Sequence, residues 1–196
     1  MKKRILISTK QLKKNPKYYE VYFNEGATFL KEGKKEEAYN SFSLCIEITP
    51  YYKALFARAI LLTETKQYTK AINDLDLVIK EKPALAKAWF QRALCKDEAG
   101  RIEESLADYN TAIQLSPTEA LYFLNRAMAL GKLNRIQESI TDLNSAVEIK
   151  PDYAKAYYLR AIGKYRMKEN PCEDFIKADQ LGYPEAAAAV RKLCGR

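Results

Sequence analysis

Residues 105–117 read SLADYNTAIQLSP, and this stretch decides the fold because the chain carries four versions of it. Each version has a small residue, a large apolar residue four positions later, a further small or apolar residue three positions on, and a closing proline. The prolines, Pro50, Pro83, Pro117 and Pro151, follow one another at intervals of 33, 34 and 34 residues. A period of about 34 residues predicts an array of helical hairpins.

The spacing inside the stretch is that of one buried face of an α-helix. Ser105, Tyr109 and Ala112 fall at i, i+4 and i+7, as in an amphipathic helix. The proline ends this helix, because residues before a proline are disfavoured in the helical region. Upstream lies a first helix with a bulky residue and, four positions later, a small one, as in Tyr22 and Gly26. A bulky and a small residue at this spacing let two helices pack closely.

Alignment on the prolines predicts five copies between two end segments. The copies span residues 19–51, 52–85, 86–119, 120–153 and 154–182. Turns inside the copies are expected at Gly33, Gly100 and Asn134, residue types suited to ending a helix. In the fifth copy the second helix, from Pro171, arrives two residues early, which predicts a shorter internal turn. Residues 183–196 are predicted to hold a capping helix (184–195), because a terminal repeat must cover the last apolar face.

The net charge of +8 is concentrated at the N-terminus. Residues 1–17 hold seven of the 33 basic side chains and none of the 25 acidic ones, which leaves 26 basic against 25 acidic residues in 18–196. The repeats are nearly neutral and predict no strong binding of nucleic acid, whereas the basic N-terminal segment, 1–18, keeps that hypothesis open. No stretch is long and apolar enough to span a membrane.

The absence of histidine narrows the chemistry. It excludes Ser-His-Asp and Cys-His nucleophile systems and Cys2His2 zinc sites. Cys45 and Cys95 occupy apolar repeat positions, where a free cysteine behaves as a small hydrophobe. Cys172 and Cys194 lie near the start and end of the last hairpin, so a disulfide is one alternative. Two reduced thiols are the other, favoured if the chain stays in the cytosol.

Two charged series recur with the fold period. The arginines are Arg58, Arg92, Arg126 and Arg160. The aspartates are Asp74, Asp108, Asp142 and, two residues early, Asp174. They could form a ladder for anionic ligands, or a structural ladder in which each arginine pairs with an aspartate of a nearby second helix. Because both series follow the fold period, the structural interpretation is favoured.

Residues 19–182 resemble the tetratricopeptide repeat (TPR) family. The resemblance rests on an aromatic residue or Leu at position 4 of each copy, Gly or Ala at 8, Ala or Ser at 20, an aromatic residue or Leu at 24, a small residue at 27 and Pro at 32. The variant with Arg-Ala at positions 7 and 8, Asp at position 23 and a Cys-Glu-Asp-Phe tail beginning at Cys172 resembles bacterial members, especially those of Bacteroidetes-type bacteria. The resemblance implies an all-α, right-handed superhelical solenoid of about five helix-turn-helix repeats with a C-terminal capping helix. Its concave face would receive peptides or partner helices.

The resemblance also implies which residues face that groove. In the family, positions 2, 5, 9, 12 and 13 of the first helix do so. Here positions 5 and 9 are mostly apolar and position 2 is often lysine, which predicts an apolar floor edged by positive charge. The predicted groove residues are Phe23, Lys53, Phe56, Ile60, Lys87, Phe90, Leu94, Leu124, Met128, Lys155 and Tyr158, and position 9 adds Ile162 in the fifth copy.

The expected function is therefore a non-enzymatic scaffold or adaptor that binds a protein or peptide partner in the groove. No small-molecule substrate, cofactor or metal is expected. The alternative is a self-associating structural module, a homo-oligomer formed through an exposed apolar groove or end. Binding of nucleic acid through the basic segment is a weaker third hypothesis. The expected compartment is the cytoplasm, or the periplasm or exterior if an export signal has been removed.

Overall fold

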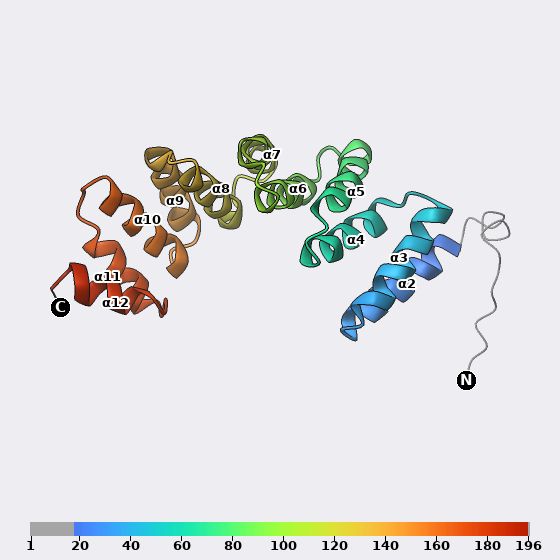
Figure 1. Ribbon diagram of the computed structural model, residues 1–196, viewed down its shortest axis with the longest axis horizontal. Helices are drawn as coiled ribbons and strands as arrows, with labels where there is room; N and C mark the ends of the chain where they lie inside the picture. Colours follow the sequence, from blue (N-terminus) through green and yellow to red (C-terminus); the bar gives the residue numbers. More distant parts are fainter. Residues whose placement is uncertain (1–17, 196) are drawn as a thin grey trace. The chain divides into compact units, whose positions relative to one another are not determined.

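The structure, a computed structural model, describes residues 18–195, which form eleven helices and no strand (Figure 1). The helices are α2 (Tyr18–Lys31), α3 (Lys35–Ile48), α4 (Tyr52–Glu64), α5 (Tyr68–Glu81), α6 (Ala86–Glu98), α7 (Ile102–Leu115), α8 (Ala120–Lys132), α9 (Ile136–Ile149), α10 (Ala154–Arg166), α11 (Cys172–Gln180) and α12 (Ala186–Leu193). The predicted all-α class is confirmed. Except for Tyr18, the basic segment and the nucleic-acid hypothesis that depends on it lie outside the described residues.

Within each unit, several pairs of successive helices pack against one another. α2 contacts α3, α4 contacts α5, α8 contacts α9, and α10 contacts α11, which in turn contacts α12. The chain divides into two compact units. Unit 1 ends at Cys95 and unit 2 begins at Lys96, so the division falls within α6.

Every turn inside a hairpin has one residue in the left-handed region of backbone space. These residues are Gly33 (φ 74°), Lys66 (58°), Gly100 (79°), Asn134 (61°) and Lys168 (62°). The next residue donates its backbone N–H to the carbonyl five residues back, as Arg101 does to Lys96 at 2.8 Å. This bond closes the helix end in the manner of a Schellman motif. The turns predicted at Gly33, Gly100 and Asn134 are confirmed.

The prolines end the second helices as expected. α3, α5, α7 and α9 each stop two residues before a proline. A proline cannot donate a helical hydrogen bond, and its ring restricts the residue before it. The ends of these second helices therefore recur along the chain at the same spacing as the prolines.

The core of each unit is built from the repeating apolar positions. In unit 1 a Cβ added to Gly26 would lie 2.7 Å from Phe42, so the absence of a side chain lets α2 approach α3. In unit 2, Leu124 and Leu143 pack together with Ala146. Cys45 and Cys95 are free and buried, as their apolar positions predicted.

The fifth copy differs from the prediction of a shorter turn. The described turns between first and second helices usually have three residues, but five residues, 167–171, separate α10 from α11. The second helix has lost its first turn because Pro171 and the residue before it are disfavoured inside a helix. The Asn170 side chain instead accepts a hydrogen bond from the N–H of Cys172 at 3.0 Å.

The last helix is joined covalently to the fifth copy. Cys172, at the start of α11, forms a disulfide with Cys194, directly after α12, and their Cα atoms are 5.6 Å apart. Of the two alternatives, the disulfide is therefore the one found. Val190 of α12 packs on Ala161 and Phe175, so α12 covers the end of the array as a capping helix.

Candidate functional site

Three of the recurring arginines bind a recurring aspartate through two hydrogen bonds each. Arg58 donates from Nε and Nη2 to the two carboxylate oxygens of Asp74, both at 2.8 Å. The corresponding distances are 2.8 and 2.6 Å for Arg126 with Asp142, and 2.9 and 2.5 Å for Arg160 with Asp174. All three aspartates are buried. The structural interpretation of the two series is confirmed for these pairs.

The same guanidinium groups also reach the preceding copy. Arg126 of α8, which pairs with Asp142 of α9, donates from Nη1 to Asn110 of α7 at 2.8 Å. Equivalent bonds join Arg58 to Ser43 (3.1 Å), Arg92 to Asp76 (2.6 Å) and Arg160 to Asn144 (2.9 Å). Arg58, Arg126 and Arg160 therefore each tie their own hairpin to the one before. Donors engaged in this way are structural and do not form a site for anionic ligands.

Burial and hydrogen bonding act in opposite directions on Asp174. Burial by itself would raise the pKa of this carboxyl group, but hydrogen bonds from Arg160 and Lys164 outweigh it and hold the pKa below its usual value. The Nζ of Lys164 lies 2.8 Å from the carboxylate. In unit 1 the hydrogen bond to Asp74 raises the pKa of Arg58. The fold therefore favours the charged form of both groups.

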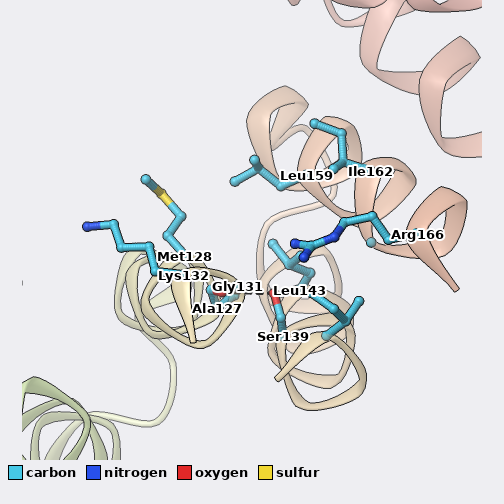
Figure 2. Close-up of a pocket in the computed structure, with 11 residues that line it drawn as sticks. Ala127, Met128, Gly131, Lys132, Ser139, Leu143, Leu159, Ile162 and Arg166 are labelled. Carbon is cyan, nitrogen blue, oxygen red and sulfur yellow. Dashed lines mark hydrogen bonds between the residues drawn. The ribbon is translucent and has the colours of Figure 1, made fainter. Parts of the chain in front are cut away.

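A hollow of about 340 Å³ opens in unit 2 between α8, α9 and α10 (Figure 2). Its walls carry large apolar side chains from all three helices: Met128 of α8, Ile136 and Leu143 of α9, and Leu159 and Ile162 of α10. Figure 2 shows Met128 rising from α8 on one side and Leu159 projecting from α10 on the other. The hollow can therefore receive apolar groups.

Two glycines shape this hollow in different ways. A Cβ added to Gly163 would lie 2.9 Å from Ile140, so this glycine lets α10 approach α9 closely. A Cβ added to Gly131 would find its nearest neighbour, the Ser139 Oγ, at 3.9 Å. Gly131 is therefore not required for packing, and the lack of a side chain there leaves space in the hollow. The Ser139 hydroxyl donates to the Ala127 carbonyl at 2.8 Å.

Some of the predicted groove residues line the hollow and others do not. Met128 and Ile162 line it. Leu124 is 2% exposed and Phe90 is 8% exposed, so the expectation that they form an open floor is corrected. Leu124 is directed into the core of unit 2, where it packs with Leu143.

Two predicted aromatic residues are engaged in contacts with other rings. Phe23 lies 5.2 Å from Tyr51 in an edge-on arrangement, measured between ring centroids. The Tyr158 ring lies 4.6 Å from that of Tyr183 and 5.6 Å from that of Phe175. Lys53, Ile60 and Lys87 are exposed, and Phe56, Leu94 and Lys155 are partly buried. None of the eight predicted groove residues in this paragraph lines the hollow of unit 2. They are Phe23, Lys53, Phe56, Ile60, Lys87, Leu94, Lys155 and Tyr158.

Sequence reasoning did not single out six residues of the hollow: Gly131, Lys132, Ile136, Leu159, Gly163 and Arg166. Positions 12 and 13, which face the groove in the resembled family, would have found three of them. Applied to the last two copies, those positions select Gly131, Lys132 and Arg166, together with Tyr165, which is not among the residues that line the hollow. Ile136, Leu159 and Gly163 have no such signal, because their role depends on how closely α10 approaches α9.

Between residues 18 and 195, no helix is long and apolar enough to cross a membrane. In the same part of the chain, no three His, Cys, Asp or Glu residues are grouped so that they could hold a metal ion.

The repeats match known sequence families. Models described as tetratricopeptide repeat match residues 19–52, 86–119 and 120–153, which together make up more than half of the chain. Among curated proteins, no sequence matches significantly.

Solved structures are similar in fold and distant in sequence. MamA (residues 41 to the end) from Desulfovibrio magneticus RS-1 has a TM-score of 0.77 at 19% identity, covering 83% of this chain and 94% of the other. YrrB, described as a TPR protein with an unusual peptide-binding site, has a TM-score of 0.78 at 15% identity, covering 94% of this chain and 97% of the other. At these identities the likeness concerns the fold alone. Together with the sequence matches, it identifies the chain as a member of the tetratricopeptide repeat family with an all-α TPR solenoid fold.

Proposed function

We propose that this protein is a non-enzymatic interaction scaffold, and that the hollow between α8, α9 and α10 holds apolar side chains of a peptide or partner helix. Membership of the TPR family supports the general class. The similarly folded YrrB is described as having a peptide-binding site, which supports a peptide as the occupant. The volume of about 340 Å³ lies at the lower end of the range of about 300 to 1,000 Å³ typical of ligand sites.

One observation carries the proposal: large apolar side chains from three helices line a hollow that Gly131 leaves unfilled. Met128, Leu159 and Ile162 remain partly exposed there. Apolar surface exposed in a concave place gains free energy when another apolar group covers it. In such interfaces a few anchoring side chains in a pocket supply most of the binding energy. The exposed residues Lys53, Ile60 and Lys87 of unit 1 remain predicted contacts with a protein or peptide partner.

Filling the hollow tests the proposal without disturbing the core. Gly131→Leu places a side chain in the open space, and leucine also favours a helix more than glycine does. The matched control is Ala107→Leu, a small residue changed to leucine at an exposed position of α7. The probe is a random-peptide phage library selected on the full chain, followed by fluorescence polarisation with labelled synthetic copies of the selected peptides.

We expect Gly131→Leu to weaken binding of the selected peptides by about tenfold or more, whereas Ala107→Leu leaves it unchanged. Equal binding to the parent and to Gly131→Leu would show that the hollow is not the binding site. Sedimentation at several concentrations tests the self-associating alternative. A concentration-dependent dimer that Gly131→Leu abolishes would identify a second copy of the chain as the occupant.

A further inference from the structure

Arg166, at the end of α10, differs from the arginines that join the repeats. Its Nη2 donates to the side-chain oxygen of Asn134 at 2.7 Å, and this partner is neutral. Within residues 18–195 no carboxylate pairs with Arg166, whereas Arg160 of the same helix binds Asp174 through two bonds. The Arg166 side chain is exposed. Its positive charge is therefore available to another molecule.

The charge of Arg166 lies beside two hollows. The residue lines the apolar hollow and also a second hollow of about 450 Å³, which residues 134–138 and Met167 complete. Ile136 lines both as well, so the two hollows adjoin. Figure 2 shows the guanidinium group extending from α10 toward the space that faces α8. A chain segment lying in the first hollow would therefore pass beside this group.

The charges around the hollows favour an acidic occupant. The lining of the apolar hollow includes Lys132 and Arg166 and no acidic residue. Lys132 is held by Asp97, with its Nζ 2.9 Å from the carboxylate, and in Figure 2 its side chain extends away from Arg166. Glu138 in the second hollow is already paired with Arg135. Arg166 is thus the lining cation that keeps an uncompensated charge.

We propose that the hollow between α8, α9 and α10 selects peptide segments in which an Asp or Glu side chain lies next to a large apolar one, and that Arg166 binds the acidic side chain. This rests on the proposed function, and it adds the chemistry of the partner. A guanidinium has five N–H donors, so one bond to Asn134 leaves donors for a two-point contact with a carboxylate. Because Arg166 is exposed, the pair contributes more to specificity than to affinity.

An internal side chain fits this position better than a C-terminal carboxylate. Space continues on both sides of Arg166, into the apolar hollow and into the one completed by Met167. A peptide can run past the guanidinium and need not end there. The protein's own residues 1–17, which carry seven positive and no negative side chains, are unsuited to the same place.

The test is a charge exchange between Arg166 and the peptide. The peptides selected from the phage library on the full chain should be enriched in Asp or Glu beside large apolar residues. Arg166→Glu should weaken binding of a synthetic acidic peptide by about tenfold and bind a copy with Lys in place of the acid better than the parent does. Arg191→Glu, which makes the same charge change at an exposed position of α12, is the matched control and should have no effect.

The outcomes separate this inference from the proposed function. Some selected peptides could lose binding to Gly131→Leu, and so need the open hollow, yet carry no acidic residue and bind Arg166→Glu as well as the parent. That result would overturn the role of Arg166 alone. Peptides that ignore Gly131→Leu as well would overturn both. Enrichment only of peptides whose acid is the free C-terminal carboxylate would refute the choice of an internal side chain. Circular dichroism of each variant establishes that it is folded before binding is compared.

Discussion

The bond between Arg58 and Asp74 should be one of the strongest single contributions to the stability of unit 1. Asp74 has a buried side chain, 8% exposed, and both its oxygens accept hydrogen bonds from Arg58 at 2.8 Å. Asp74→Ala leaves the Arg58 side chain, which is only 20% exposed, without its carboxylate partner. Removing one partner of a buried ion pair costs about 3 to 5 kcal/mol. Because solvent still reaches Arg58, we expect a value near the lower end, about 3 kcal/mol.

The same helix supplies a matched control. Asp76 of α5 also binds a recurring arginine, Arg92, at 2.6 Å, but its side chain is 51% exposed. An exposed ion pair contributes about 0 to 1 kcal/mol. Asp76→Ala should therefore cost less than about 1 kcal/mol, although the residue type, the helix and the substitution are the same.

Trp89, the single tryptophan, reports on this unit directly. It packs on the cluster that contains Leu55 and Val78, so its fluorescence follows the unfolding of unit 1 in urea. With a urea slope of about 2 kcal/mol per molar, a loss of 3 kcal/mol lowers the midpoint by about 1.5 M. If Asp74→Ala and Asp76→Ala lowered the midpoint equally, the argument from burial would be refuted.

Three further predictions concern the turns, the acid response and the cap. Gly100→Ala should lower the stability of unit 2 by about 1 kcal/mol in thermal unfolding, because φ is 79° there and no atom lies within 4 Å of an added Cβ, whereas Gly131→Ala should not destabilise. Since its pKa is lowered in the fold, Asp174 should contribute stability above the usual aspartate pKa of about 4, and this contribution should be lost as pH falls through the lowered value. Acid titration of Asp174→Asn should show a smaller loss of stability over that interval than the parent, and identical profiles would contradict the assignment. Cys172→Ser should destabilise the end of the array by about 3 kcal/mol through the lost cross-link, seen as faster amide exchange in α12, with unchanged exchange counting against it.

The helices, their ends and the charged ladder could be predicted because each follows from local chemistry repeated at a fixed period. A proline ends a helix wherever it stands, and Gly100 or Asn134 accepts a left-handed backbone more readily than other residues do. Lys66 and Lys168 occupy the same turn position without any such preference. Only the packing of the helices on either side explains their conformation, because the repeat imposes the turn on whichever residue is there.

The fifth copy shows how tertiary contacts override a register read from the sequence. Asp174 arrives two residues early and still binds Arg160, as its place in the series predicted. The helix around it begins late, at Cys172, so the turn is longer where a shorter one was expected. The chain keeps the ion pair between Arg160 and Asp174 and lengthens the connection between α10 and α11. Extra loop residues cost less free energy than a buried charge without a partner.

The sequence by itself determined the repeat, the helix pairs and the residue types available to a groove. The tertiary structure decided which of them face the core and which face a hollow. Leu124 and Met128 are both large, apolar and groove-facing by their positions, yet Leu124 is buried and Met128 lines open space. That difference depends on the distances between three helices and on a missing side chain at Gly131. Burial is a property of all the neighbours together, and no single repeat contains them.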